Sequence, residues 1–271
     1  MKYILNLTII LTLLTSQVFA QTPKETVAEV LEKSGSLVQF NQIDAMIDAQ
    51  VAARKAGFEN EEDFEKFSKF MKSAFNSESL KRDFISYFEQ KANEDTLQIV
   101  SEIYENPLVV KMKETETSAN DPSKQAEMLA FFQGFQSSPP SPERAQLVVE
   151  LHKELGTAEM TVSIMKNMIV SIAKGANTLQ PEDKRVSEDE ILKGIASAFP
   201  AGFEQQLTSQ LVAMSIYTYK DISDADLEKY VAVWKDPASK YFINMTMEAL
   251  NYSFSKVGEN MGKEMVEEFS K

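Results

Sequence analysis

The stretch EIYENPLVVKM, residues 102–112, decides how the fold is predicted, because AVWKDPASKYF, residues 232–242, repeats its order of residue types. Each stretch has an aromatic residue, a charged residue, Asn or Asp, and then Pro. Asn and Asp favour the N-cap of a helix, and Pro fits the first helical turn, where no backbone hydrogen bond is lost. Both stretches therefore predict the end of one helix and the immediate start of another.

The similarity of the two stretches extends along the flanking sequence. Pro237 follows Pro107 by 130 positions. When the two halves are aligned at this spacing, cap residues match cap residues and apolar residues match apolar residues: Tyr87 and Tyr217, Asn93 and Ser223, Leu97 and Leu227, Ile103 and Val233, Tyr104 and Trp234, Asn106 and Asp236. Upstream, Gly156 follows Gly35 by 121 positions, and the neighbouring pairs are Val30 with Leu151 and Ile43 with Ile164. The difference of nine positions suits an insertion in a predicted loop at 175–186. One such pair is common by chance, but this many matched roles in register predict an internal duplication.

Helical patterns cover almost the whole chain. Apolar residues recur at spacings of three and four, as on one face of a helix, for example at Phe64, Phe67, Met71 and Phe75. Helix starts are marked by capping boxes or cap residues at Thr22–Glu25, Asn60, Asn93, Ser141, Thr157, Ser187–Glu190 and Ser223. We therefore predict an all-α protein with two related multi-helix halves in a bundle-like arrangement.

The chain divides into five predicted parts. Residues 1–20 are a signal peptide, 21–136 the first helical repeat with a connecting helix, 137–143 a linker rich in Ser and Pro, 144–258 the second helical repeat, and 259–271 a charged tail. Solenoid repeats span about 20–50 residues. The much longer unit here predicts two similar helical domains or one pseudo-symmetric bundle.

The first twenty residues, MKYILNLTIILTLLTSQVFA, have an early Lys2, an apolar run and a small-x-small end at 18–20. This is the pattern of a cleaved secretory signal peptide. The apolar run is shorter than the roughly 20 residues that a membrane helix needs, so we favour cleavage over a membrane anchor. No later stretch predicts a span, and the expected location is the periplasm or the outside of the cell.

The composition excludes several classes of partner. The chain carries 41 acidic and 28 basic residues, a net charge of −13, and no cluster of basic residues. Phosphate backbones and anionic membrane surfaces repel such a chain, so we expect no binding to nucleic acid. There is no Cys, which excludes disulfides and a lipid-bearing Cys. A chain of this length can build its core without such covalent support.

The second half resembles a known family in the segment SIYTYKDISDADLEKYVAVWKDPASKYF, residues 215–242. A helix end, a Ser cap, an acidic-Leu turn, an aromatic residue and a polar-Pro pair follow one another there. This order is similar to that of the bacterial exported family called domain of unknown function 2059, and NEDTLQIVSEIYENPLVVKM, residues 93–112, is a weaker copy. The chain differs from the family pattern at Asp236, Ser239 and the pair Val233-Trp234. The resemblance implies an exported helical protein and brings no catalytic residues.

No motif in the sequence specifies a catalytic, cofactor or metal site. His152 is the single His, and without Cys it cannot supply the two or three His or Cys ligands of a typical zinc site. It lies on or beside an apolar face, so we expect a structural role, although a Ser-His-Asp triad assembled in space stays open. The acidic clusters are expected in first helical turns, where they complement the helix dipole: Glu59 with 61–63, 94–95, 188–190, and Asp224 with Asp226.

The 17 Phe and 13 Met are the most unusual feature of the composition. At helical spacing they belong mainly to a core, but Met and large aromatic side chains also line adaptable grooves. We expect a non-enzymatic binding or interaction protein with an apolar cleft between its halves, which holds an apolar ligand or a partner protein. We expect Tyr104 and Trp234 to pack the two joints and not to bind a ligand. Two alternatives stay open: a hydrolase of envelope polymers with two facing carboxylates, and a structural or assembly factor with a flat apolar patch.

Overall fold

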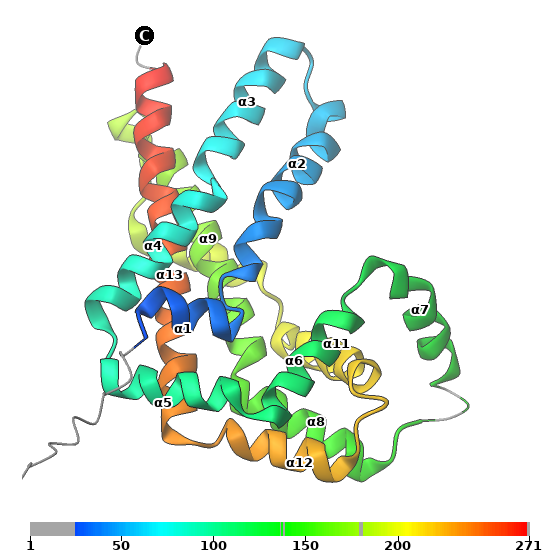
Figure 1. The fold of residues 1–271 in the computed structure, drawn as a ribbon. Helices are drawn as coiled ribbons and strands as arrows, with labels where there is room; N and C mark the ends of the chain where they lie inside the picture. Colours follow the sequence, from blue (N-terminus) through cyan, green and yellow to red (C-terminus); the bar gives the residue numbers. More distant parts are fainter. Residues whose placement is uncertain (1–24, 136, 138, 179–180, 270–271) are drawn as a thin grey trace, which may run out of the picture.

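The computed structural model describes residues 25–269 except 136, 138 and 179–180 (Figure 1). The prediction of an all-α fold is confirmed, because the described residues form helices joined by turns and none of them lies in a strand. The predicted signal peptide at 1–20 and the predicted cap Thr22 lie outside the described residues.

The helices before the linker are α1 (Val27–Ser34), η1 (Val38–Gln42), α2 (Ile43–Arg54), η2 (Lys55–Gly57), α3 (Glu61–Ala74), α4 (Ser77–Lys91), α5 (Glu94–Glu105), α6 (Pro107–Ala119), η3 (Pro122–Lys124) and α7 (Gln125–Gly134). Those after it are α8 (Pro142–Leu155), α9 (Thr157–Thr178), η4 (Glu182–Lys184), α10 (Glu188–Ala198), α11 (Phe203–Thr218), α12 (Asp224–Val233) and α13 (Pro237–Phe269).

Side-chain caps begin most of these helices where the sequence predicts them. Asn60, Asn93, Ser141 and Ser223 each accept a hydrogen bond from a backbone N–H of the first turn, and Ser187 forms its capping box with Glu190. The predicted cap of α1, Thr22, was wrong, because the helix begins after Thr26. The cap is Thr26, whose box partner is Glu29, while Glu25 instead accepts hydrogen bonds from α1 and α5.

Three other segments differ from the predicted element boundaries. The helix expected from Leu37 to Gly57 is divided into η1, α2 and η2. α9 continues to Thr178, inside the predicted loop at 175–186, and α13 continues through the predicted tail as far as Phe269. Periodicity alone does not fix such boundaries, since packing against a neighbour extends or bends a helix beyond its local signals.

The larger of two buried cores lies where α13 passes over α4 and α5. Phe40, Phe84 and Phe88 are almost completely buried there, with ring centroids 5.3 Å apart for Phe40 and Phe84 and 5.2 Å apart for Phe84 and Phe88. Phe242 of α13 continues the row, 5.7 Å from Phe88. A helix from the end of the chain therefore completes a core that the first half begins.

The smaller core lies among α6, α8, α11 and α12. Val109 and Met112 of α6 are fully buried in it, beside Val148 and Leu151 of α8 and Leu227 of α12. α6 therefore belongs to the first half by sequence and packs with the second half.

The two cores have corresponding arrangements in which each half contributes a helix to the other. α1 packs against α4 and α5, and α8 packs in the same way against α11 and α12. The helix that completes each trio comes from the other half, since α13 packs against α4 and α5 whereas α6 packs against α11 and α12. The two halves thus interlock across the predicted boundary at the linker. The duplication itself stays a prediction.

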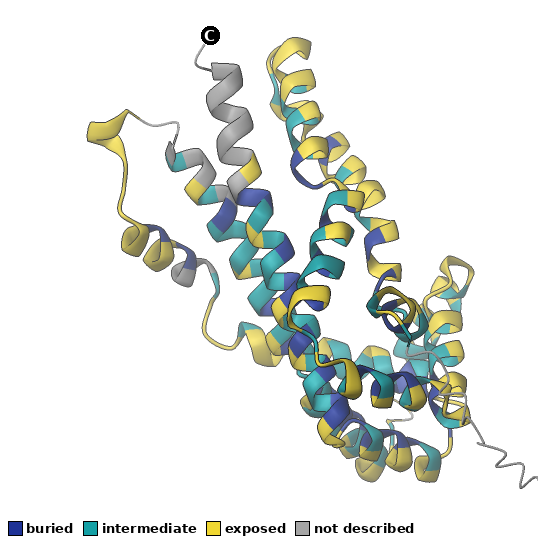
Figure 2. Cartoon of the chain, turned by 60° about the vertical axis from the view of Figure 1, so that its left-hand side comes forward, coloured by how far each residue is buried: buried dark blue, intermediate teal, exposed yellow. Residues whose placement is uncertain are grey.

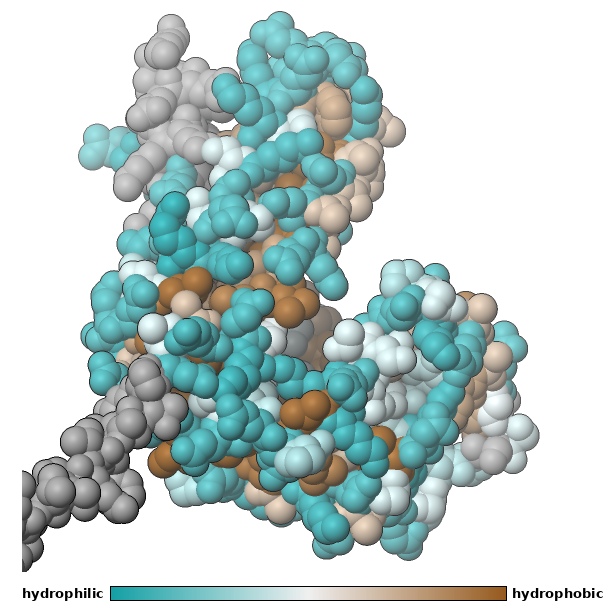
Figure 3. All heavy atoms as spheres, in the orientation of Figure 1, coloured by the Kyte–Doolittle hydropathy of each residue, from teal (hydrophilic) through white to brown (hydrophobic). Residues whose placement is uncertain are grey.

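The outer parts of the molecule are less buried than the region around these cores. α2 and α3 form an antiparallel hairpin that projects away from α5, α8 and α12 (Figure 1), and most of its residues are exposed (Figure 2). The surface is hollowed between this hairpin and α7, and hydrophobic residues come to the surface there (Figure 3). Within the described part of the chain, no helix is both long enough and apolar enough to cross a membrane.

Candidate functional site

The two joints singled out in the sequence meet in space. The ring of Tyr104, at the end of α5, packs edge-on against the indole of Trp234, just after α12, with centroids 6.1 Å apart. Each joint restarts its next helix through the same bond: Asn106 Oδ1 accepts from Leu108 N at 2.9 Å, and Asp236 Oδ1 accepts from Ala238 N at 2.8 Å. The expectation that the two aromatic residues pack the joints is confirmed, with the addition that they pack against each other.

A small pocket lies beside this aromatic pair, and we call it the junction pocket. It has a volume of about 210 Å³ and is lined by Ser36, Tyr104, Leu155, Thr157, Met160, Trp234, Phe242, Ile243 and Thr246. Its walls include members of both cores, since Phe242 belongs to the larger and Trp234 to the smaller. At the predicted offsets, Ser36 corresponds to Thr157 and Tyr104 to Trp234, so the pocket lies where corresponding parts of the two halves converge.

Most of the wall of the junction pocket is apolar, and two of its hydroxyl groups already bond to other side chains of the protein. The Thr157 hydroxyl bonds to the His152 ring at 3.1 Å, and the Ser36 hydroxyl bonds to Ser34 at 2.7 Å. Thr246 Oγ1 is buried with no hydrogen-bond partner. The Trp234 indole nitrogen also makes no hydrogen bond, although it approaches the Tyr230 hydroxyl closely enough to influence the pKa of that phenol. An apolar wall with few polar groups is typical of a small-molecule pocket.

A wider groove of about 680 Å³ adjoins the junction pocket through Tyr104, which lines both. We call it the α6 groove, because α6 forms most of its wall. The other wall residues come from α1, α5 and the segment after α6, and the full set is Lys33, Tyr104, Val110, Lys113, Glu114, Thr117, Ser118 and Asp121. Lys113 Nζ lies 5.4 Å from the centroid of the Tyr104 ring and donates a hydrogen bond to the Lys33 carbonyl. Burial lowers the pKa of this ammonium group.

A partly buried carboxylate ties α6 to the second half. Glu116 Oε1 accepts hydrogen bonds from the hydroxyls of Tyr219 at 2.6 Å and Tyr230 at 2.9 Å. Burial raises the pKa of Glu116, and the two hydroxyls and Lys113 oppose that shift without cancelling it. Burial beside the Glu116 charge also raises the pKa values of both phenols, so these remain donors. The cluster is a structural cross-link, because Glu116 lines neither the junction pocket nor the α6 groove.

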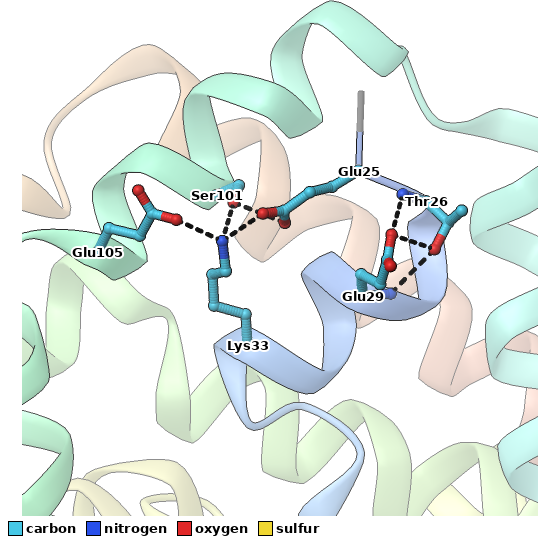
Figure 4. Close-up of polar contacts among 6 residues, drawn as sticks. All are labelled: Glu25, Thr26, Glu29, Lys33, Ser101 and Glu105. Carbon is cyan, nitrogen blue, oxygen red and sulfur yellow. Dashed lines mark hydrogen bonds and ion pairs between the residues drawn. The ribbon is translucent and has the colours of Figure 1, made fainter. Parts of the chain in front are cut away.

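Lys33, near the end of α1, is surrounded by acceptors from the segment before α1 and from α5 (Figure 4). Its ammonium group donates to Glu25 at 2.5 Å, Ser101 at 2.7 Å and Glu105 at 2.6 Å. These bonds lower the pKa of Glu25 and raise the pKa of Lys33. The charge of Lys33 is therefore neutralised within the protein, and the group anchors α1 to α5.

His152 is buried, and both ring nitrogens have hydroxyl partners. Nδ1 lies 3.1 Å from Thr157 Oγ1 and Nε2 lies 2.8 Å from Ser215 Oγ, so the ring connects α8, α9 and α11. A Ser-His contact is present, but the third partner of a triad would be a carboxylate that orients the imidazole, and here a threonine occupies that position. Burial lowers the pKa of His152, which keeps the ring neutral. These contacts match the structural role that we expected.

The predicted acidic clusters lie in first helical turns, except for Glu59, which precedes the cap Asn60 of α3. Glu61–Asp63, Glu94–Asp95, Glu188–Glu190 and Asp224 with Asp226 occupy the first turns of α3, α5, α10 and α12. Among the described residues, no three His, Cys, Asp or Glu side chains gather as a metal site would require. A carboxylate hydrolase needs two acids facing one another across a cleft. Glu116 has the raised pKa that one of them would need but faces two tyrosines.

Sequence analysis did not single out Glu116 or Lys113. The available signal was their position, since Glu116 follows the buried Met112 by four residues and Lys113 follows the buried Val109 by four. Residues at this spacing share one helix face, so a charged side chain there is predicted to approach the core. The junction pocket had no comparable signal, because its wall comes from four helices and from the turns after α1 and α12.

Comparison of the chain with protein-family models, curated proteins and solved structures finds no match in any of the three. The similarity to domain of unknown function 2059 therefore stays a prediction from the quoted segments.

Proposed function

We propose that this protein is an exported, non-enzymatic binding protein whose junction pocket holds a small apolar group of a ligand. The export part of this proposal comes from the pattern of residues 1–20 and from the resemblance to an exported family. The binding part is supported by the pocket. Six of its nine wall residues are apolar or aromatic: Tyr104, Leu155, Met160, Trp234, Phe242 and Ile243.

The single observation that carries the proposal is that this pocket opens between the two cores and has a mostly apolar wall. An enclosed engineered cavity of about 150 Å³ binds benzene. The junction pocket has a volume of about 210 Å³ and is open to the surface, so it suits one ring or a short alkyl chain of a ligand whose other end stays outside.

Trp234 provides a direct test, because it is the single Trp of the chain and lines the pocket. The purified protein is titrated with 4-phenyl-1-butanol while the Trp234 emission is followed. We expect a saturable change in emission that Ile243→Phe abolishes, since the larger side chain fills the pocket. Ile99→Phe is the matched control, because Ile99 is exposed on α5 and lies outside the pocket wall. A non-saturable response, or one that Ile243→Phe leaves unchanged, would contradict the proposal.

A further inference from the structure

We infer that the ligand is a small monocarboxylate, whose ring or short alkyl chain enters the junction pocket and whose carboxylate pairs with Lys113 in the α6 groove. This inference rests on the proposed function and adds to it the chemical class of the ligand.

Lys113 forms no ion pair of its own within the described part of the chain. Other partly buried cations of the two cores have carboxylates: Lys33 has Glu25 and Glu105, Arg144 has Asp224, and Lys240 has Glu154. Among the described residues, no carboxylate lies within ion-pair distance of Lys113. The Glu116 charge acts on Lys113 from beyond that distance, and Glu116 Oε1 accepts from two tyrosines. A partly buried cation without an ion pair is costly, and a bound anion would lower that cost.

Lys113 lies beside Tyr104, a residue of the junction pocket wall. Its ammonium nitrogen lies over the ring of Tyr104, which lines both the junction pocket and the α6 groove. It also lies 3.6 Å from the position that a Cβ on Gly35 would occupy, next to the pocket residue Ser36. A ligand that fills the pocket and emerges past Tyr104 would therefore bring its polar end toward this cation.

The charges of the α6 groove limit the charge of the ligand. Two acidic side chains, Glu114 and Asp121, also line the α6 groove, and both are exposed. Together with Glu116 they would repel a second negative charge near Lys113. A single carboxylate matches one unpaired ammonium group, whereas a phosphate dianion would meet this repulsion. The same acids make a large anion unfavourable along the rest of the groove.

The experiment compares three probes of the same skeleton by Trp234 fluorescence: 4-phenylbutyrate, 4-phenyl-1-butanol and 4-phenylbutylamine. A hydrogen bond to a charged group is worth enough to predict that the carboxylate binds about tenfold more tightly than the alcohol or better. The amine should bind most weakly. The preference for the carboxylate should decrease at high salt, because the ion pair lies near the surface.

Variants of α6 separate charge from structure. Lys113→Met should remove the preference for the carboxylate and leave alcohol binding unchanged, and Lys113→Arg should keep the preference. Lys111→Met is the matched control, because Lys111 is on the same helix, is exposed, pairs with Asp226 and does not line the α6 groove. It should leave all three affinities unchanged.

The possible outcomes distinguish the two proposals. If the alcohol binds in the pocket and the carboxylate binds no better, or if Lys113→Met keeps the carboxylate preference, the monocarboxylate inference is wrong while the proposed function stands. If none of the probes changes Trp234 emission in a saturable way, both are wrong. A carboxylate preference that Lys113→Met and Lys111→Met reduce equally would reflect the general charge of the surface and would also overturn the inference.

Discussion

Gly258 lies between the two longest helices, α9 and α13, where its side chain, a single hydrogen atom, leaves room for close packing. It is buried where α13 crosses α9, and a Cβ placed on it would lie 2.3 Å from Ser171 Cβ and 2.5 Å from Ser171 Cα. The sequence shows Gly258 and Gly262 four positions apart, with no indication of what they contact. The structure gives its role, which is to allow the two helix backbones to approach closely.

Replacing Gly258 with Ala should therefore destabilise the protein although Ala is the better helix former. The new methyl group overlaps backbone atoms of Ser171, and such overpacking typically costs about 1–3 kcal/mol. Gly194→Ala in α10 is the matched control, because a Cβ there meets nothing within 4 Å. That change should stabilise the helix by about 0.5–1 kcal/mol. Chemical unfolding measures both, and equal effects of the two substitutions would contradict the packing role of Gly258.

Glu116 predicts a dependence of stability on pH. Its pKa is raised above the ordinary value of 4.5, so the folded state holds this proton more tightly than the unfolded state does. The contribution of Glu116 to stability is therefore most favourable below about 4.5 and decreases as pH rises through the folded-state pKa. Glu116→Gln removes this decrease and keeps an oxygen for the tyrosine hydroxyls.

We therefore expect Glu116→Gln to unfold at a higher temperature than the parent protein at pH 7, with the difference disappearing near pH 4. Thermal unfolding of the two proteins at several pH values measures this, and only their difference is compared because other carboxylates also titrate. Glu127→Gln is a useful control of opposite sign, since its ion pairs with Lys124 and Lys220 lower the pKa of Glu127. A difference for Glu116→Gln that does not vary with pH would show that the carboxyl is not held in the way described.

At the scale of the elements, we predict the same response to substitution at both joints. Asn106 and Asp236 cap α6 and α13 with the same side-chain bond to the backbone two residues ahead. Asn106→Ala and Asp236→Ala should each cost about 1 kcal/mol, the usual loss for a helix cap. The exchanges Asn106→Asp and Asp236→Asn should be nearly neutral, because both residue types cap well. Unfolding in urea compares the four variants, and a large cost for either exchange would argue against equivalent joints.

Elements whose signals are local could be predicted from the sequence. Caps such as Asn60 and Ser223 contact their own first turn, so the residue type is enough to locate them. The cap of α1 was misplaced because Thr22 and Thr26 both begin a Thr-x-x-Glu segment, and only tertiary contacts distinguish them. Glu25 is occupied by Lys33 and Ser101, which leaves Thr26 with Glu29 as the pair that closes the box.

At the scale of the whole molecule, the sequence indicated two related halves but not how they fit together. The exchange of α6 and α13 could not be predicted, because their apolar faces fit either half equally well by pattern. For the same reason the junction pocket was expected as a cleft lined by Phe and Met, whereas its wall contains one of each, Phe242 and Met160. Which side chains reach a shared wall depends on the packing of distant helices.

The exchange predicts that the halves stay together without a covalent link. A specific protease site is inserted between residues 139 and 140 of the full chain, which keeps the cap Ser141 of α8, and the folded protein is then cut. The two fragments should elute together in gel filtration under native conditions and separate in denaturant, because α6 and α13 each pack in a core that the other fragment helps to build. Separation under native conditions would mean that the linker, rather than the interlocked helices, holds the molecule together.

The distance along the chain between α4 and α13 also sets a limit on when the larger core can close. Ribosomes add roughly 5–20 residues per second and release the N-terminal part first. Phe84 and Phe88 are therefore made well before their core partners Phe242, Leu250 and Val257. Part of the apolar surface of the first half stays uncovered until α13 has been made. For a chain that is exported, as proposed here, this delay would help to keep the chain unfolded during export, so that it folds in the compartment to which it is exported.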